Sequence, residues 1–100
     1  MRLGERILAQ RSARGVFEAL GRCAPDGPDA VSVATALNRL AKCADGSEAL
    51  PWEEFAALAS EAHRLVLADQ FDARGLSNMS WACAALEFRD QPFLDSIASA

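Results

Sequence analysis

Apolar residues recur at helical spacing along this chain, in segments that proline and glycine separate. The clearest segment follows Pro51, where the apolar positions are Phe55, Leu58, Ala59, Ala62, Leu65 and Val66. Recurrence at i, i+3, i+4 and i+7 places side chains on one face of an α-helix, whereas a strand needs alternation. The pattern therefore predicts an all-α chain.

Five helical segments are predicted. They cover residues 3–22, as one helix or two short ones, then residues 29–43, 51–68 and 73–88, and a last segment from residue 92 onward. Ser12, Asp29 and Asp72 stand where N-caps are expected, because their side-chain oxygens accept hydrogen bonds from the first free N–H groups of a helix. Two prolines within residues 24–28 end the first segment, since proline is excluded from helix interiors.

The segment at residues 73–88 carries two apolar stripes. Leu76, Met79, Cys83 and Leu86 form the first, and Trp81, Ala84 and Phe88 form the second. A helix that is apolar on two sides must be covered on two sides. We therefore expect this helix at the centre of a stack. The many alanines favour close approach of the helix backbones.

Two stretches of the chain resemble each other. Val33, Ala36 and Leu40 align with Met79, Ala82 and Leu86, and the helix that follows each stretch repeats as well: Phe55, Leu58, Ala59 and Ala62 align with Leu94, Ile97, Ala98 and Ala100. Two helices per unit, at a period of about 39 to 46 residues, is typical of an α-solenoid.

The repeat predicts an α-solenoid-like stack of helical hairpins. Residues 1–28 would form an N-terminal helix and a Pro/Gly linker, residues 29–70 a first hairpin, and residues 71–100 a second, truncated hairpin. A single closed five-helix bundle is the alternative, because short alanine-rich helices resemble one another easily.

Charge is unevenly distributed along the chain, whose formal charge is −4. Residues 1–22 hold five arginines and two acids, while residues 47–72 hold six acids and one arginine. Nucleic-acid-binding modules usually carry a basic face. The sequence offers one only near its N-terminus, which counts against strong RNA binding by this chain alone. Residues 1–14 fit either an arginine-rich transit peptide or an ordinary first helix.

Several classes of site are not expected. Cys23, Cys43 and Cys83 lie far apart without a C-x-x-C pair, which argues against disulfides and structural zinc and predicts three core residues. No apolar run approaches the roughly 20 residues of a membrane span. His63 has no nearby nucleophile in sequence. We expect no catalytic residue, metal, cofactor or small-molecule substrate, and hence no enzyme.

One segment carries a family resemblance. Residues 71–86 hold Leu76, Asn78, Trp81, Ala82, Ala84 and Leu86. This pattern resembles the Leu-x-Asn-x-x-Trp-Ala-x-Ala-x-Leu helix of octotricopeptide and heptatricopeptide repeats, which FAST-kinase-like and RAP-domain proteins also contain. The resemblance covers roughly residues 29–100. Leu76, Trp81, Ala82, Ala84 and Leu86 are thereby predicted to form the repeat-motif core.

The resemblance implies a function in the RNA metabolism of a mitochondrion or plastid. Without the resemblance, a cytoplasmic location is expected. Proteins of this group bind single-stranded organelle RNA, or join ribonucleoprotein subunits, in RNA stability, processing or translation. Equivalent helix faces in a solenoid line up along one surface. The predicted RNA-binding residues are Asn38, Arg39 and Lys42 of the first hairpin and Arg74, Ser77 and Asn78 of the second.

Two alternatives remain open at this level. A solvated helix face would also account for each of these polar residues, and Trp81 is either a core residue, as we expect, or a platform for a base. The competing function is a protein–protein scaffold within a larger complex such as an organelle ribosome. It would dock neighbouring subunits through the acidic third helix, without direct RNA contact.

Overall fold

A computed structural model describes residues 7, 9–21 and 29–99. The predicted linker at residues 24–28, Cys23 and Ala100 lie outside these residues. The elements are, in order, α2 (Ala13–Leu20), α3 (Ala30–Lys42), the short 3-10 helix η1 (Gly46–Ala49), α4 (Glu53–Leu67), α5 (Ala73–Leu86) and α6 (Gln91–Ser99). The described residues contain no strand, and the predicted all-α class is confirmed.

Three helices begin where the sequence places their caps. The side chains of Ser12, Asp29 and Asp72 each accept a hydrogen bond from the backbone N–H three residues later, over 3.1, 2.8 and 2.7 Å. Each bond satisfies a donor that the first helical turn leaves without an intrahelical partner. The predicted starts of α2, α3 and α5 are confirmed.

Two predicted helix ends differ from the structure. Pro51 is not the first residue of α4, because the 3-10 turn before it continues until the Trp52 N–H bonds the Ala49 carbonyl at 2.9 Å. The helix therefore begins at Glu53. At the other end, α5 stops at Leu86 because Glu87 adopts a left-handed conformation with φ 60°.

The helices α4 and α5 end in the same hydrogen-bonded turn. After α5, Glu87 N–H bonds the Ala84 carbonyl and Phe88 N–H bonds the Cys83 carbonyl. After α4, the Asp69 and Gln70 N–H groups bond the carbonyls of Val66 and Leu65 in the same arrangement, and Asp69 has φ 57°. This turn satisfies the last free carbonyls of a helix and favours glycine at the left-handed position. Here an acidic residue holds that position both times.

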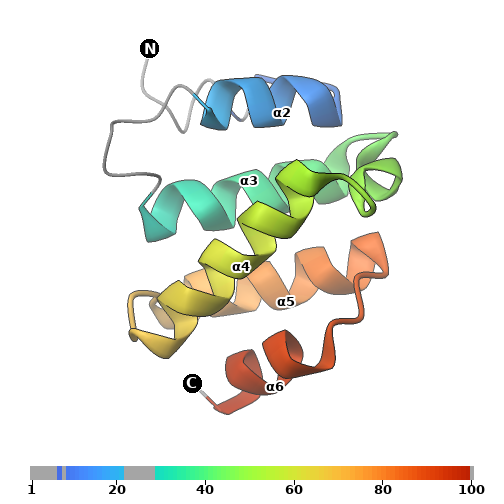
Figure 1. The fold of residues 1–100 in the computed structure, drawn as a ribbon. Helices are drawn as coiled ribbons and strands as arrows, with labels where there is room; N and C mark the ends of the chain where they lie inside the picture. Colours follow the sequence, from blue (N-terminus) through green and yellow to red (C-terminus); the bar gives the residue numbers. More distant parts are fainter. Residues whose placement is uncertain (1–6, 8, 22–28, 100) are drawn as a thin grey trace.

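The helices stack as hairpins that lie side by side (Figure 1). In Figure 1, α3 lies between α2 and α5, and α3 and α5 run in the same direction. The contact between α3 and α5 is the most extensive in the described fold, and α4 packs against both α3 and α6. First helices therefore pack on first helices and second on second, as a hairpin repeat requires. The body measures 33 × 27 × 23 Å.

Burial follows the predicted repeat in the first helices. The buried residues shared by α3 and α5 are Val33, Ala36, Leu37 and Leu40, and Met79, Ala82, Cys83 and Leu86. In the second helices the register is shifted by one. Phe93, not Leu94, takes the place of buried Phe55, because both rings pack on Phe88, at 5.0 and 6.2 Å between centroids.

The predicted two-sided burial of α5 is wrong within this chain. Trp81 is 48% exposed and Ala84 is exposed, so neither belongs to the core. Ala82 and Leu86 are buried as predicted, and Leu76 is half-buried. The cause is geometric: α3 and α6 both pack against α5, and among the described elements no helix covers the Trp81 side.

Truncating a core leucine is expected to cost far more than truncating an exposed one. Leu40 is fully buried in α3, and Leu67 at the end of α4 is 72% exposed. Leu40→Ala should lower the free energy of unfolding by about 2 to 5 kcal/mol, because it removes apolar contacts and leaves a cavity. Leu67→Ala, the matched control, should change it by less than about 0.5 kcal/mol. Urea denaturation followed by circular dichroism measures both, and equal losses would contradict this core.

Glycine at the left-handed turn after α5 is expected to stabilise the fold. Glu87→Gly should raise the free energy of unfolding by about 0.5 to 1 kcal/mol, because glycine has no Cβ to oppose a positive φ. The control is Ala57→Gly, at an exposed position inside α4, which should lower the same quantity by about 1 kcal/mol. Thermal unfolding distinguishes the two, and a loss of stability in Glu87→Gly would argue against the turn.

Candidate nucleic-acid interface

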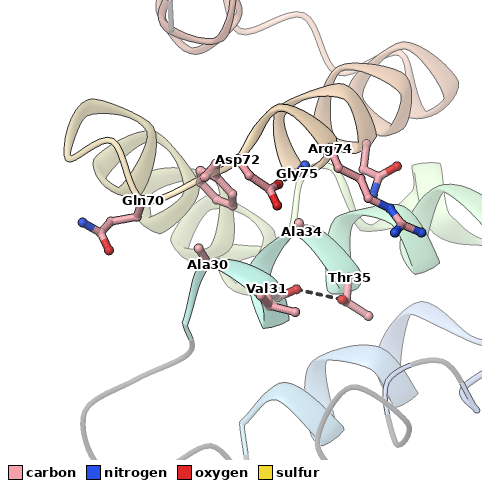
Figure 2. Close-up of a pocket in the computed structure, with 10 residues that line it drawn as sticks. Ala30, Val31, Ala34, Thr35, Gln70, Asp72, Arg74 and Gly75 are labelled. Atoms are coloured by element: carbon pink, nitrogen blue, oxygen red, sulfur yellow. Dashed lines mark hydrogen bonds between the residues drawn. The ribbon is translucent and has the colours of Figure 1, made fainter.

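An open cavity of about 470 Å³ lies between the N-terminal halves of α3 and α5. Figure 2 shows its lining, and the Asp72 side chain lies at the start of α5 beside Gly75. The lining residues are Ala30, Val31, Ala34, Thr35, Gln70, Phe71, Asp72, Arg74, Gly75 and Asn78. The cavity is thus a feature of the hairpin stack, since one wall comes from each of the two first helices.

Helical spacing extends this cavity into a longer surface. On α3, Val31, Thr35, Asn38 and Lys42 follow one another at intervals of four, three and four residues, which places them on one face. On α5, Arg74, Asn78 and Trp81 do the same at intervals of four and three. These seven residues are called the α3/α5 face below.

The two stripes of the α3/α5 face meet at both ends. At the N-terminal ends of the helices, Val31 and Thr35 line the same cavity as Arg74 and Asn78. Nearer the C-terminal ends, the Lys42 Nζ lies 6.0 Å from the centroid of the Trp81 ring. A cation within about 6 Å of an aromatic ring is attracted to its π face. The face therefore joins a cavity with both polar and apolar lining residues to an exposed aromatic ring with an ammonium beside it.

Four of the six predicted RNA-binding residues come together on this face. Lys42, Arg74 and Asn78 contact the cavity or the Trp81 ring, and Asn38 belongs to the same stripe of α3 by its spacing. Within the described chain, no hydrogen bond or ion pair occupies the side chains of Arg74 and Asn78. Both are therefore available to a ligand.

Two predicted residues do not join them. The Arg39 Nε donates a hydrogen bond to the Gln10 carbonyl over 2.6 Å, so this guanidinium attaches the segment before α2 to α3. The RNA-binding role predicted for Arg39 stays a prediction, and the structure gives its Nε a contact within the fold. Ser77 is exposed but does not line the cavity.

Trp81 is the residue of this face that sequence reasoning assigned to the wrong environment. A signal for its true position was present, because Trp81 follows Arg74 by seven residues and Asn78 by three. That spacing places it on the polar side of α5, whereas its alanine neighbours suggested a core position. An exposed tryptophan is informative, because a large aromatic side chain is usually mostly buried.

The two layers of the stack differ in charge. The residues of α3 and α5 include three basic side chains and no acid: Arg39, Lys42 and Arg74. The residues of α4 and α6 include four acids and one arginine: Glu53, Glu54, Glu61, Asp95 and Arg64. The α3/α5 face is therefore locally basic on a chain of net negative charge.

The ion pairs of the described chain lie away from this face. Arg14 pairs with Glu54, and Arg64 with Glu61, and each arginine holds the pKa of its partner carboxyl below the usual value through a hydrogen bond. Asp72 borders the cavity, but its carboxylate accepts the Gly75 N–H. Lys42 and Arg74 thus keep their charge available.

The buried thiols are not candidate nucleophiles. Burial raises the pKa of Cys83 to about 11, with a smaller contribution from Asp90, and burial also raises the pKa of Cys43. Both thiols stay protonated near neutral pH, and a thiol reacts as its thiolate. Both are core residues, as predicted.

Among residues 7, 9–21 and 29–99, no three histidine, cysteine, aspartate or glutamate side chains gather closely enough to hold a metal ion. No helix there has the length and the apolar character needed to cross a membrane.

Comparison of the chain with models of protein families, with curated proteins and with solved structures finds no match.

Proposed function

We propose that the chain is an RNA-binding helical-repeat module that uses its α3/α5 face to hold single-stranded RNA, without catalysing a reaction. The proposal rests on one observation: the cavity that Arg74 and Asn78 line is continuous with an exposed Trp81, which has Lys42 beside its ring. Cationic grooves with accessible aromatic side chains are the usual means by which proteins bind single strands.

Each component of the face has a role in this proposal. The ammonium of Lys42 and the guanidinium of Arg74 would contact phosphates, which supply most of the affinity of a protein for nucleic acid. Asn78 carries both a donor and an acceptor, so its amide fits the edge of an unpaired base. The α3 and α5 helices themselves carry no acidic side chain, and the carboxylates of the N-caps Asp29 and Asp72 lie at their starts. Like-charge repulsion is therefore weakest along the part of the face that runs from Arg74 to Lys42 and Trp81.

The biological setting is proposed from the sequence motif. The resemblance of residues 71–86 to octotricopeptide-type repeats supports a role in the stability, processing or translation of mitochondrial or plastid RNA. The two hairpins stack on each other, and their first helices bury equivalent positions, as repeat units do. This supports a helical repeat, whatever its family.

A protein–protein scaffold is the second candidate, and the acidic layer favours it. Glu53 and Glu54 are exposed at the start of α4, and Glu61 lies two turns further along the same helix. Such a surface fits a basic partner, for example a subunit of a ribonucleoprotein. The two candidates use opposite layers, so variants on each layer can separate them.

Removing the two free cations of the α3/α5 face is expected to abolish the salt-dependent part of RNA binding. Fluorescence anisotropy with a labelled pool of short single-stranded RNAs, at several salt concentrations, gives the slope of log affinity against log salt. Lys42→Ala combined with Arg74→Ala should reduce that slope by about 1.4, because each phosphate contact on a single strand contributes about 0.7.

The matched control for this experiment is Arg64→Ala. It removes one positive charge from the acidic layer, where Arg64 pairs with Glu61, and it should leave the RNA slope unchanged. Absence of RNA affinity at low salt would refute the proposal. An equal effect of Arg64→Ala would show that binding is nonspecific and does not depend on the α3/α5 face.

A further inference from the structure

The exposed ring of Trp81 lies at one end of a line of polar side chains. Arg74 and Asn78 precede it on α5 by seven and three residues, and both line the cavity. At about 1.5 Å of rise per residue, Arg74 and Trp81 are separated by roughly 10 Å along the helix. This distance is long enough for a phosphate at one end of the face and a base at the other to belong to the same strand.

Packing does not account for the position of this tryptophan. Trp81 is 48% exposed, whereas the core side of α5 is filled by Met79, Ala82, Cys83 and Leu86. The Lys42 ammonium, on the neighbouring helix, lies 6.0 Å from the centroid of the ring. An accessible indole next to a lysine can take either of two partners, the ammonium itself or a flat group that displaces it.

We infer that Trp81 is the stacking platform for one unpaired base, and that Lys42 is displaced from the ring to the adjoining phosphate when the base binds. This inference rests on the proposed RNA-binding function and assigns the ligand of one part of its surface. The flexible stem of Lys42 allows the movement, because four rotatable carbon–carbon bonds lie between its backbone and its ammonium group. The face consequently selects single strands, since the bases of a duplex are already stacked on one another.

The inference separates two kinds of binding contribution. Stacking on an indole depends on the base and is nearly independent of salt, whereas a phosphate contact depends on salt and not on the base. Trp81→Leu should therefore weaken binding of single-stranded RNA about 10-fold to 100-fold and leave the salt slope unchanged. Lys42→Ala should reduce the slope by about 0.7.

The experiment compares three ligands and one control variant. The ligands are a pool of short single-stranded RNAs, duplexes of the same length, and abasic strands that carry the same phosphates without bases. Leu67→Ala is the control, because it also truncates an exposed apolar side chain but lies on α4, off the face. Circular dichroism of each variant establishes that its helices are retained.

A fluorescence measurement reports on the ring directly. The chain has two tryptophans, so Trp52→Phe leaves Trp81 as the sole reporter. We expect its emission to be quenched by single-stranded RNA and unchanged by the abasic strand. The Trp81→Leu variant should lose most of the preference for RNA over abasic strands, because only the phosphate contacts and the Asn78 amide remain.

The outcomes distinguish this inference from the function on which it rests. In one outcome the wild-type chain binds RNA, and Lys42 and Arg74 account for the salt slope, but Trp81→Leu binds equally tightly and the emission of Trp81 does not change. The stacking platform is then refuted, and the RNA-binding function stands. If abasic strands bind the wild-type chain as well as RNA does, the platform is refuted in the same way. If no nucleic acid binds, both fail.

Discussion

Burial of α3 is the constraint on which the rest of the structure depends. This helix packs against α2, α4 and α5, and its apolar residues Val33, Ala36, Leu37 and Leu40 are wholly inaccessible to solvent. No single neighbouring helix could cover so wide an apolar surface, so several must converge on it. The alanines at matched positions allow this convergence, because a small side chain lets two backbones approach closely.

The same constraint determines which surface remains available for a ligand. The buried sides of α3 and α5 point to the interior. The outward stripes of these two helices do not pack in the core, so they can hold polar, basic and aromatic side chains. On α3 and α5 these stripes face each other and enclose the cavity beside Arg74 and Asn78. Among α3, α4, α5 and α6, the acidic residues belong to α4 and α6, and the α3/α5 face carries Lys42 and Arg74, so a chain that is acidic overall presents a locally basic face. The net charge of −4, taken alone, gives no indication of this basic surface.

The candidate site was predictable only in part. Polarity and helical spacing predicted Lys42, Arg74 and Asn78, and the structure brings all three onto the α3/α5 face. Arg39 has the same polarity and nearly the same position, yet its guanidinium bonds the Gln10 carbonyl. Lys42, three residues further along α3, lies beside the Trp81 ring of α5, whereas Arg39 contacts the segment before α2. Sequence spacing gives the angle between two side chains on a helix, and it does not say which neighbour lies at that angle.

The sequence by itself determined the helical class, the N-caps of α2, α3 and α5, and the main buried stripe of α3 and of α5, because these features depend on local hydrogen bonds and on the period of the backbone. The tertiary structure alone decided the register of α6, where the contact of Phe93 with Phe88 overrides the alignment to Leu94. It also decided the exposure of Trp81. A large aromatic residue is buried only where another element covers it, and the covering element is a property of the assembled stack, which no local pattern of residues specifies.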